Sequence, residues 1–347
     1  MTISGVSILL LFIIITGLIF ALSNGLHDAS SVVATFISCG AATPKQAIAV
    51  ASCFGMLGAV FGGNAVANTV SSVIDLPAKT SLLSVLLAAI LGATAWNLIT
   101  WKLGLPSSST HALIGGIIGA VMASSGYQHV LWGWNELTGP GHIITGIVKI
   151  ILSLLISPLL GFILAFILEK GLKLFLRNAK FSMNKWIKRI QWLISAGLSY
   201  NHGANDTQKS IGLIVLALTA ATGSATQASP LWARLCGGFV MFFGTVLGGW
   251  SIMKTIGRGI YDIQPIHSVG SQLASVSSIF AANLAGAPVS TTHIVVGSVM
   301  GVGVADEYRM VHWGAVKEII VSWLITIPLS AVISAAIYMV FSFVKII

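Results

Sequence analysis

The sequence is poor in charge: only 8% of its 347 residues are Asp, Glu, Lys or Arg, and nine are acidic. Ordinary soluble domains carry about 25% charged residues, so this composition excludes a typical soluble protein. Three cysteines are present, Cys39, Cys53 and Cys236, without the C-x-x-C spacing of a zinc or redox site. We therefore expect neither disulfides nor a metal cluster, and predict that the cysteines are small core residues.

Apolar residues take the place of the missing charge. They make up 56% of the chain, and apolar segments of about 20 residues, the length of a membrane-spanning helix, recur from end to end. A membrane β-barrel would instead show shorter segments of alternating polarity. The predicted fold class is an all-α integral membrane protein.

One polar motif occurs twice. Residues 104–111 read Gly-Leu-Pro-Ser-Ser-Ser-Thr-His, and residues 286–293 read Gly-Ala-Pro-Val-Ser-Thr-Thr-His. Seven of the seventeen residues from 104 to 120 are identical to their counterparts from 286 to 302. An apolar run follows each motif, so we expect each proline to open a membrane helix whose first N–H groups and hydroxyls suit an anion.

The rest of the chain follows the same division into two halves. Residues 1–168 form an N-terminal repeat and residues 190–347 a C-terminal repeat, joined by a basic linker helix at 169–189. Each repeat is predicted to hold three membrane spans, the first broken by polar residues, plus one re-entrant helical hairpin, which makes about 10 to 12 helical membrane segments. After three crossings the chain has reached the opposite side of the membrane. The second repeat should therefore insert with the opposite orientation to the first, as in secondary transporters.

Glycines and basic residues refine this plan. Gly55, Gly58 and Gly62, in the second span, are spaced so that another helix can approach closely. Seven Lys and Arg fall in the 169–189 linker, where Glu169 is the only acid. Because short cytoplasmic loops are rich in Lys and Arg, we place the linker in the cytoplasm and both termini outside. The expected surroundings are lipid, and no nucleic acid partner is expected.

Two acids fall inside predicted spans, at matching places in the halves: residues 25–28 read Gly-Leu-His-Asp and residues 203–206 read Gly-Ala-Asn-Asp. A charge in the bilayer core costs several kcal/mol, so an acid there is a functional candidate. An ion pair between Asp206 and Lys209, one helical turn away, is a competing structural explanation. The predicted coupling-ion residues are Asn24, His27, Asp28, Asn205 and Asp206.

A second predicted site takes an anion. Two helix N-termini that converge would surround a tetrahedral oxyanion with N–H groups and hydroxyls. Lys209 could add charge to the anion or neutralise Asp206, and the sequence leaves both roles open. His111 and His293 are expected to be packing residues. The predicted substrate-binding residues are Ser107, Ser108, Ser109, Thr110, Gln208, Lys209, Ser290, Thr291 and Thr292.

The four motifs together resemble those of the inorganic phosphate transporter (PiT) family. Each Asp motif is followed in its own half by Pro-Ser-Ser-Ser-Thr-His or Pro-Val-Ser-Thr-Thr-His. The resemblance implies a secondary symporter for inorganic phosphate, not an enzyme, with phosphate at the hairpin tips and coupling cations near the Asp motifs. It also implies that the protein lies in a bacterial plasma membrane and uses no cofactor besides the coupling cation. Whether two copies form a homodimer is left open.

One departure from the family pattern bears on the coupling ion. Sodium-coupled members tend to have Asn-Asp in both halves, whereas this chain has His27 before Asp28, and Ser30-Ser31 where Ala-Asn is usual. Histidine titrates near neutral pH and is a poor sodium ligand. The first half thus resembles the bacterial, proton-coupled branch, for which the resemblance implies transport of phosphate partly as a neutral metal-phosphate complex. We favour protons over sodium.

Three alternatives were weighed against this prediction. In a sodium-coupled symporter, Asp28, Asn205 and Asp206 would bind sodium. A symporter for another oxyanion such as sulfate is less favoured, because phosphate at pH 7 still carries a hydrogen that a carboxylate can accept, whereas sulfate carries none. A membrane hydrolase is disfavoured because the chain has neither H-E-x-x-H nor G-x-S-x-G.

Overall fold

A computed structural model describes residues 5–71, 79–139, 141–142, 144–223, 229–248 and 250–344. These residues contain α-helices and two short 3₁₀ helices, with no strand among them. Within the described part, five helices are long and apolar enough to cross a membrane, and the bent pair α10 and α11 passes the same test as a sixth. The α-helices are α1 (Gly5–His27), α2 (Ala29–Ser38), α3 (Pro44–Phe61), α4 (Ala65–Ser71), α5 (Lys79–Leu103), α6 (Ser109–Ser125), α7 (Trp134–Thr138), α8 (Gly146–Leu176), α9 (Met183–Thr222), α10 (Leu231–Leu247), α11 (Trp250–Gly259), α12 (Pro265–Leu284), α13 (Thr291–Glu307) and α14 (Trp313–Phe343).

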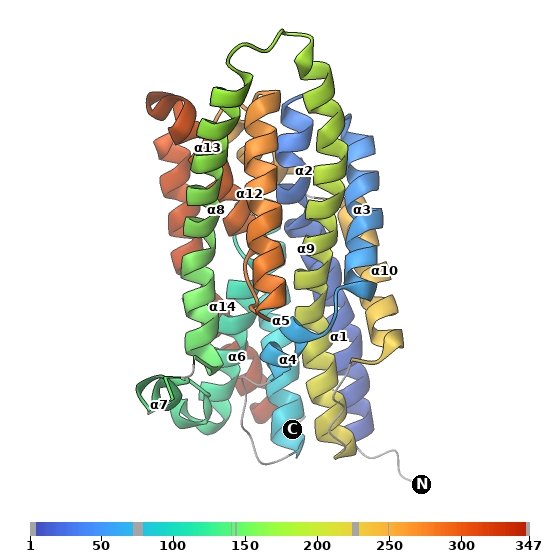
Figure 1. Ribbon diagram of the computed structural model, residues 1–347. Helices are drawn as coiled ribbons and strands as arrows, with labels where there is room; N and C mark the ends of the chain where they lie inside the picture. The colour runs from blue at the N-terminus through green and yellow to red at the C-terminus, as the bar shows by residue number, and fades with distance from the viewer. Residues whose placement is uncertain are drawn as a thin grey trace.

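The helices form an elongated bundle. Figure 1 shows α1 beginning and α14 ending at one end of the bundle, with the turn between α8 and α9 at the opposite end. The fold class predicted from the sequence, an all-α integral membrane protein, is confirmed. The second span predicted from the sequence, at about residues 47–74, corresponds to α3 followed by α4. Its last residues, 72–74, lie outside the described residues.

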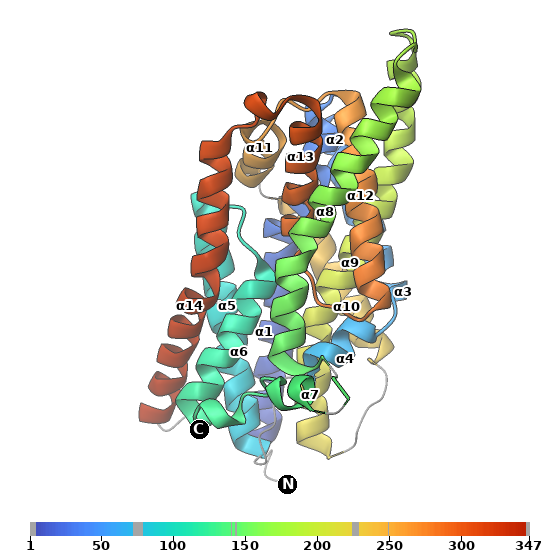
Figure 2. The same ribbon diagram turned by 60° about the vertical axis from the view of Figure 1, so that its left-hand side comes forward.

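Two helical hairpins enter the bundle from opposite ends. α5 and α6 form the first hairpin, with residues 104–108 as its tip, and α12 and α13 form the second, with residues 285–290 as its tip. Figures 1 and 2 show both tips near the middle of the bundle. The two hairpins predicted from the repeated motif are therefore present, while opposite insertion of the two halves stays a prediction.

The repeated glycines explain how the hairpins are built. Gly104 and Gly286 have φ angles of +67° and +60°, a conformation that glycine adopts without strain, and they turn the chain at the tips. Later glycines of each motif pack a hairpin against a long helix. A Cβ at Gly119 would collide with a carbonyl oxygen of α14, and a Cβ at Gly301 would collide with one of α8.

The motif prolines do not open the second helix of each hairpin, contrary to the prediction. α6 begins at Ser109 and α13 at Thr291, so Pro106 and Pro288 lie within the tips. Ser108 and Ser290 are the N-caps: their side-chain oxygens accept hydrogen bonds, each 3.2 Å long, from the backbone N–H groups of His111 and His293. A serine side chain satisfies an unpaired N–H of the first turn, which a proline cannot do, so the serine sets the boundary.

The two predicted broken spans differ. In the first half, α1 ends at His27 and α2 begins at Ala29, so the chain is interrupted at Asp28. In the second half the predicted break at 201–209 is wrong, because α9 runs through it without interruption. That stretch is polar but contains no proline, and its side chains find hydrogen-bond partners on other helices, so the backbone can remain helical.

The basic segment 169–189 is not a separate linker helix, which corrects that prediction. It consists of the last turns of α8, a connection at 177–182, and the first turns of α9. Beside it, His267 of α12 lies 2.9 Å from Asp306 of α13, which also pairs with Lys173 of α8. These contacts hold the open end of the second hairpin against α8.

Glycines bring α3 and α9 into close contact, as predicted from their spacing. A Cβ at Gly58 would collide with the carbonyl oxygen of Tyr200, and a Cβ at Gly203 would collide with that of Gly55. This packing fixes α9 next to α3 in the stretch that carries Asp206.

We therefore expect Gly203→Ala to lower the free energy of unfolding by about 1–3 kcal/mol, because the new methyl group must displace backbone of α3. Gly197→Ala is the matched control, since Gly197 lies on the same helix with open space around its Cα; it should be neutral or stabilising by up to about 1 kcal/mol. Denaturant unfolding in detergent measures both. Equal effects of the two substitutions would contradict the close packing.

Candidate functional site

Asp28 lies at the break between α1 and α2, where its carboxylate meets both hairpins. Ser109 of α6 donates a hydrogen bond to Oδ2, and Thr292 of α13 donates one of 3.0 Å to Oδ1. His27 Nδ1 lies 3.0 Å from Oδ1. Only 2% of Asp28 is exposed. This carboxylate therefore joins the broken first span to the second helix of each hairpin.

His27 extends the network into the first hairpin. Its Nε2 lies 3.2 Å from Thr100 Oγ1 on α5 and 3.3 Å from Ser107 Oγ in the tip. Ser107 also donates a hydrogen bond of 3.0 Å to Thr100. Both ring nitrogens of His27 thus lie within hydrogen-bonding distance of oxygen atoms, and the ring connects Asp28 to the first hairpin.

Asp206, on α9, has a similar set of partners. Thr291 of α13 donates a hydrogen bond of 3.0 Å to Oδ2, and His202 Nδ1 lies 3.0 Å from the same oxygen. Lys209 forms an ion pair with Oδ1. His202 is not among the residues predicted from the sequence, although its position one helical turn before Asp206 places both on one face of a helix. Each aspartate therefore has a histidine and hairpin hydroxyls around it.

Lys209 reaches from α9 to both hairpins, contacting the first turn of α6 and the tip of the second hairpin. Its Nζ donates a hydrogen bond of 2.5 Å to Thr110 Oγ1 and one of 2.9 Å to the carbonyl oxygen of Val289. Thr110 in turn donates to the same carbonyl over 2.9 Å. Of the two roles that the sequence leaves open, the structure shows Lys209 paired with Asp206, and charge for an anion stays a prediction.

The predicted hydroxyls divide into two kinds. Ser109, Thr110, Thr291 and Thr292 donate hydrogen bonds to the acids or to the opposite hairpin, whereas Ser107 donates to Thr100 of its own hairpin. The side chains of Ser108 and Ser290 cap their own helices. A hydroxyl that accepts in a cap still has a hydrogen to donate. All seven residues are buried. Thr291 and Thr292, neighbours on α13, donate to Asp206 and Asp28 respectively, so residues predicted for the anion lie against residues predicted for the cation.

The predicted asparagines lie beside this network. Asn24 Oδ1 accepts a hydrogen bond of 3.1 Å from Asn97 of α5. Asn205 Nδ2 donates to Asn283 Oδ1 over 2.7 Å and to the carbonyl of Ala287 over 3.2 Å. The buried Oδ1 of Asn205 has no hydrogen-bond partner within the described part of the chain. Asn205 thus holds the second hairpin and keeps one acceptor unused.

The side chain of Gln208, a residue predicted to bind substrate, forms hydrogen bonds with backbone atoms in this structure. Its Nε2 donates to the carbonyl of Gly62 over 3.1 Å, and its Oε1 accepts from the N–H groups of Val66 and Ala67. Both ends of the amide are occupied, so in this structure Gln208 fastens α9 to the connection between α3 and α4. Sequence spacing could not show this role, because it depends on a backbone segment more than a hundred residues away.

His111 and His293 stack on each other, with ring centroids 4.5 Å apart. His293 also stacks on Trp323 of α14, at 3.7 Å. The two histidines occupy the same place in the repeated motif, three residues after each capping serine. The packing role expected from the sequence agrees with this stack, which joins the second helices of the hairpins.

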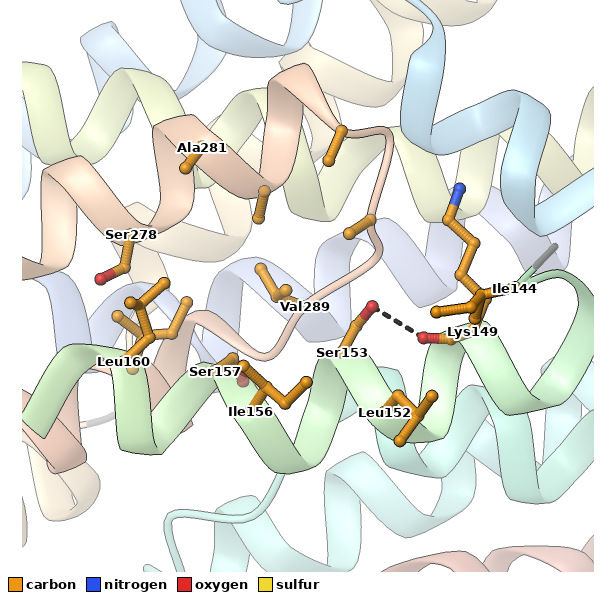
Figure 3. Close-up of a pocket in the computed structure, with 14 residues that line it drawn as sticks. Ile144, Lys149, Leu152, Ser153, Ile156, Ser157, Leu160, Ser278, Ala281 and Val289 are labelled. Carbon is orange, nitrogen blue, oxygen red and sulfur yellow. Dashed lines mark hydrogen bonds between the residues drawn. The ribbon is translucent and has the colours of Figure 1, made fainter. Parts of the chain in front are cut away.

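A groove of about 390 Å³ runs between α8 and α12 beside the second tip. Figure 3 shows that aliphatic side chains such as Leu152, Ile156 and Leu160 line it together with α12 and Val289. Lys149 extends toward α4, and its Nζ lies 3.5 Å from Thr69 Oγ1. The lining is almost entirely apolar, so this groove does not suit an anion, and the polar network on the other side of the tip is the candidate site.

The network can hold both charges of a symport reaction. It offers hydroxyl donors and one ammonium for an anion, and two carboxylates for cations or protons. The described residues contain no cluster of three His, Cys, Asp or Glu side chains arranged for a metal ion.

Thr292→Val should lower the free energy of unfolding by about 1.5–3 kcal/mol, because it removes a buried hydrogen bond to a carboxylate while keeping the side-chain volume. Thr16→Val is the control, since the Thr16 hydroxyl bonds only to carbonyls of its own helix α1. Thermal unfolding in detergent compares the two variants. A Thr292→Val variant as stable as Thr16→Val would contradict the bond to Asp28.

Comparisons with known proteins bear on the family and the fold. The sequence model of the Phosphate transporter family matches residues 24–334. A protein of Bacillus subtilis (strain 168), named probable low-affinity inorganic phosphate transporter, is 37% identical over 341 residues, which are 97% of this chain and 98% of that protein. One of the same name from Rhizobium meliloti (strain 1021) is 35% identical over 333 residues, covering 95% and 96%.

A solved structure described as the sodium-dependent phosphate transporter has the same fold, with a TM-score of 0.83 and 27% sequence identity over 96% of this chain and 99% of that one. Its likeness extends over the whole bundle and both hairpins. The sequence match, the full-length relatives and the common fold together show that the protein is a transporter, not an enzyme, and that it belongs to the Phosphate transporter family.

Proposed function

We propose that this protein imports inorganic phosphate together with protons, by secondary active symport. The observation that carries the proposal is the position of Asp28. Its carboxylate lies against His27 and accepts hydroxyl hydrogen bonds from both hairpins. The Asp28 carboxylate, which we propose binds the proton, is thus directly hydrogen-bonded to hydroxyls that we propose bind phosphate.

Electrostatics explains why these two events would be coupled. The hydroxyls of Ser109 and Thr292 now donate to Asp28. If phosphate takes those donors, the ionised carboxylate loses its hydrogen bonds and faces a second anion in a buried site, which costs several kcal/mol. A proton on the His27 and Asp28 pair removes that cost. Phosphate and proton therefore bind best together.

The chemistry of the anion favours phosphate over sulfate at this site. Phosphate near pH 7 carries at least one hydroxyl hydrogen, which a carboxylate can accept, while sulfate presents only acceptors. A neutral metal-phosphate complex would bring less charge into the network, and the same hydroxyls could bind its oxygens. Uptake measured with and without magnesium distinguishes the two forms of the substrate.

We also propose an orientation in a plasma membrane. The basic cluster spans the end of α8, the connection to α9 and the start of α9, so this end of the bundle would face the cytoplasm under the positive-inside rule. Both ends of the described chain lie at the opposite end of the bundle, which would then face outward (Figure 1).

Uptake of labelled phosphate into proteoliposomes tests the proposed function. Under an inward proton gradient in sodium-free buffer, we expect accumulation above the external concentration, and little competition from excess sulfate. Accumulation that requires an inward sodium gradient would overturn proton coupling. Sulfate accumulation without phosphate accumulation would overturn the proposed substrate.

Asp28→Asn and Asp206→Asn should each reduce concentrative uptake by at least about tenfold, since each removes a carboxylate on which the charge balance of the site depends. Asp262→Asn is the matched control, because Asp262 is exposed and lies outside the network; its uptake should equal that of the unmodified protein. Surface-accessible protein is quantified in parallel. Normal accumulation by both site variants would contradict the assigned roles.

A further inference from the structure

The two halves of the site differ at one matched position. Asp28 and Asp206 correspond in the repeat, so the residues three positions later, Ser31 and Lys209, correspond as well. Ser31 Oγ donates to the backbone carbonyl of Asp28 over 2.6 Å. At the matching place in the second half, the Lys209 side chain brings a positive charge to Asp206. The buried carboxylate of the second half therefore has a lysine partner, and the matching position of the first half holds a neutral serine.

Both members of the Asp206 and Lys209 pair are buried, so neither charge is stabilised by water. Only 1% of Lys209 and 0% of Asp206 is exposed. Lys209 Nζ has three oxygen acceptors, from Asp206, Thr110 and Val289, and an ammonium has three hydrogens to donate. A carboxylate, a hydroxyl and a backbone carbonyl are also the kinds of oxygen that bind a small hard cation. The ammonium thus occupies a set of ligands that would suit such an ion.

From these contacts we propose that Lys209 is a resident cation of the site: its ammonium takes the place beside Asp206 that a cation from solution would otherwise occupy. The inference rests on the proposed symport of phosphate with protons and adds a reason why the second half needs no sodium. In this arrangement Asp206 and Lys209 carry no net charge, and only the first half exchanges a cation with solution.

The contacts of Lys209 favour this role over a simple ion pair within α9. An i,i+3 pair on one helix needs only Asp206, yet the side chain extends to Thr110 in the first hairpin and to Val289 in the second. It bridges the two tips in the way that a bound cation would. When phosphate binds between the tips, the same ammonium is close enough to serve as its counter-charge.

The resident charge also has a consequence for the transport cycle. An isolated carboxylate in the bilayer core is strongly unfavourable. If Asp206 had no lysine partner, a transporter without phosphate could therefore change conformation only while a cation from solution was bound beside Asp206. The tethered ammonium cannot leave, so the second half stays neutral in both the loaded and the empty transporter.

Lys209→Ser tests the proposal, because it gives the second half the residue that the first half has. Its thermal unfolding in detergent is compared in sodium chloride and in choline chloride of equal ionic strength. We expect sodium to stabilise the variant, since sodium can now bind beside Asp206. The unmodified protein and Lys102→Ser, whose lysine is exposed at the end of α5, should show no such stabilisation. A Lys209→Ser variant indifferent to sodium would overturn the proposal.

The double variant Asp206→Asn/Lys209→Ser controls for folding, because it removes both charges of the buried pair. It should fold and show no response to sodium. If the double variant folds but Lys209→Ser folds in neither salt, sodium cannot replace the ammonium, and the proposal is overturned. If Lys209→Ser is recovered folded only when it is purified in sodium, the proposal is supported.

Transport gives an independent readout. Phosphate uptake by Lys209→Ser should be at least about tenfold higher in sodium than in choline, because the buried Asp206 carboxylate is then unpaired unless a cation binds beside it. The ratio for the unmodified protein should be near one. A ratio near one for an active Lys209→Ser variant would contradict the resident-cation role. If the unmodified protein fails to accumulate phosphate under any gradient, the proposed function fails, and the unfolding experiment still decides the role of Lys209.

Discussion

An ionised carboxylate that is buried among apolar helices must be surrounded by hydrogen-bond donors or cations, because its charge costs several kcal/mol when it is left unpaired. Asp28 meets this requirement with hydroxyls from both hairpins and with His27. Asp206 meets it with Thr291, His202 and Lys209, which itself reaches Thr110 in the first hairpin. The two hairpin tips are therefore held in the middle of the bundle by the partners that the acids require.

In the proposed mechanism, this arrangement links ion binding to substrate binding without a separate relay. The hydroxyls that donate to the carboxylates are also those proposed to bind the anion, so an anion that takes them would change the surroundings of both acids. Any movement that separates the tips must also break the contacts of Lys209 with Thr110 and Val289. Under this proposal, the binding of substrate and protons and the position of the hairpins depend on the same hydrogen bonds.

Much of the fold could be predicted from the sequence, because turns, caps and close helix contacts require particular residues. The repeated motif predicted both hairpins, and the spacing of Gly58 predicted the contact between α3 and α9. The start of each second helix was predicted at the motif proline, but it lies after the capping residues Ser108 and Ser290. The two acids could be found because a charge within an apolar span is costly. What the sequence could not show depends on distant partners: the unbroken α9, the backbone bonds of Gln208 and the contact of Lys209 with both tips. His202 could have been predicted, because residues four apart on a helix lie on the same face and His202 lies four residues before Asp206.

The proposed function requires that hydroxyls of both hairpins together form one anion site beside the two acids. The most direct test is an experimental structure with bound arsenate, a tetrahedral analogue of phosphate whose anomalous scattering identifies it. The account predicts a single arsenate between residues 107–110 and 290–292, within hydrogen-bonding distance of hydroxyls from both hairpins. Arsenate bound to one hairpin alone, or in the apolar groove between α8 and α12, would contradict it.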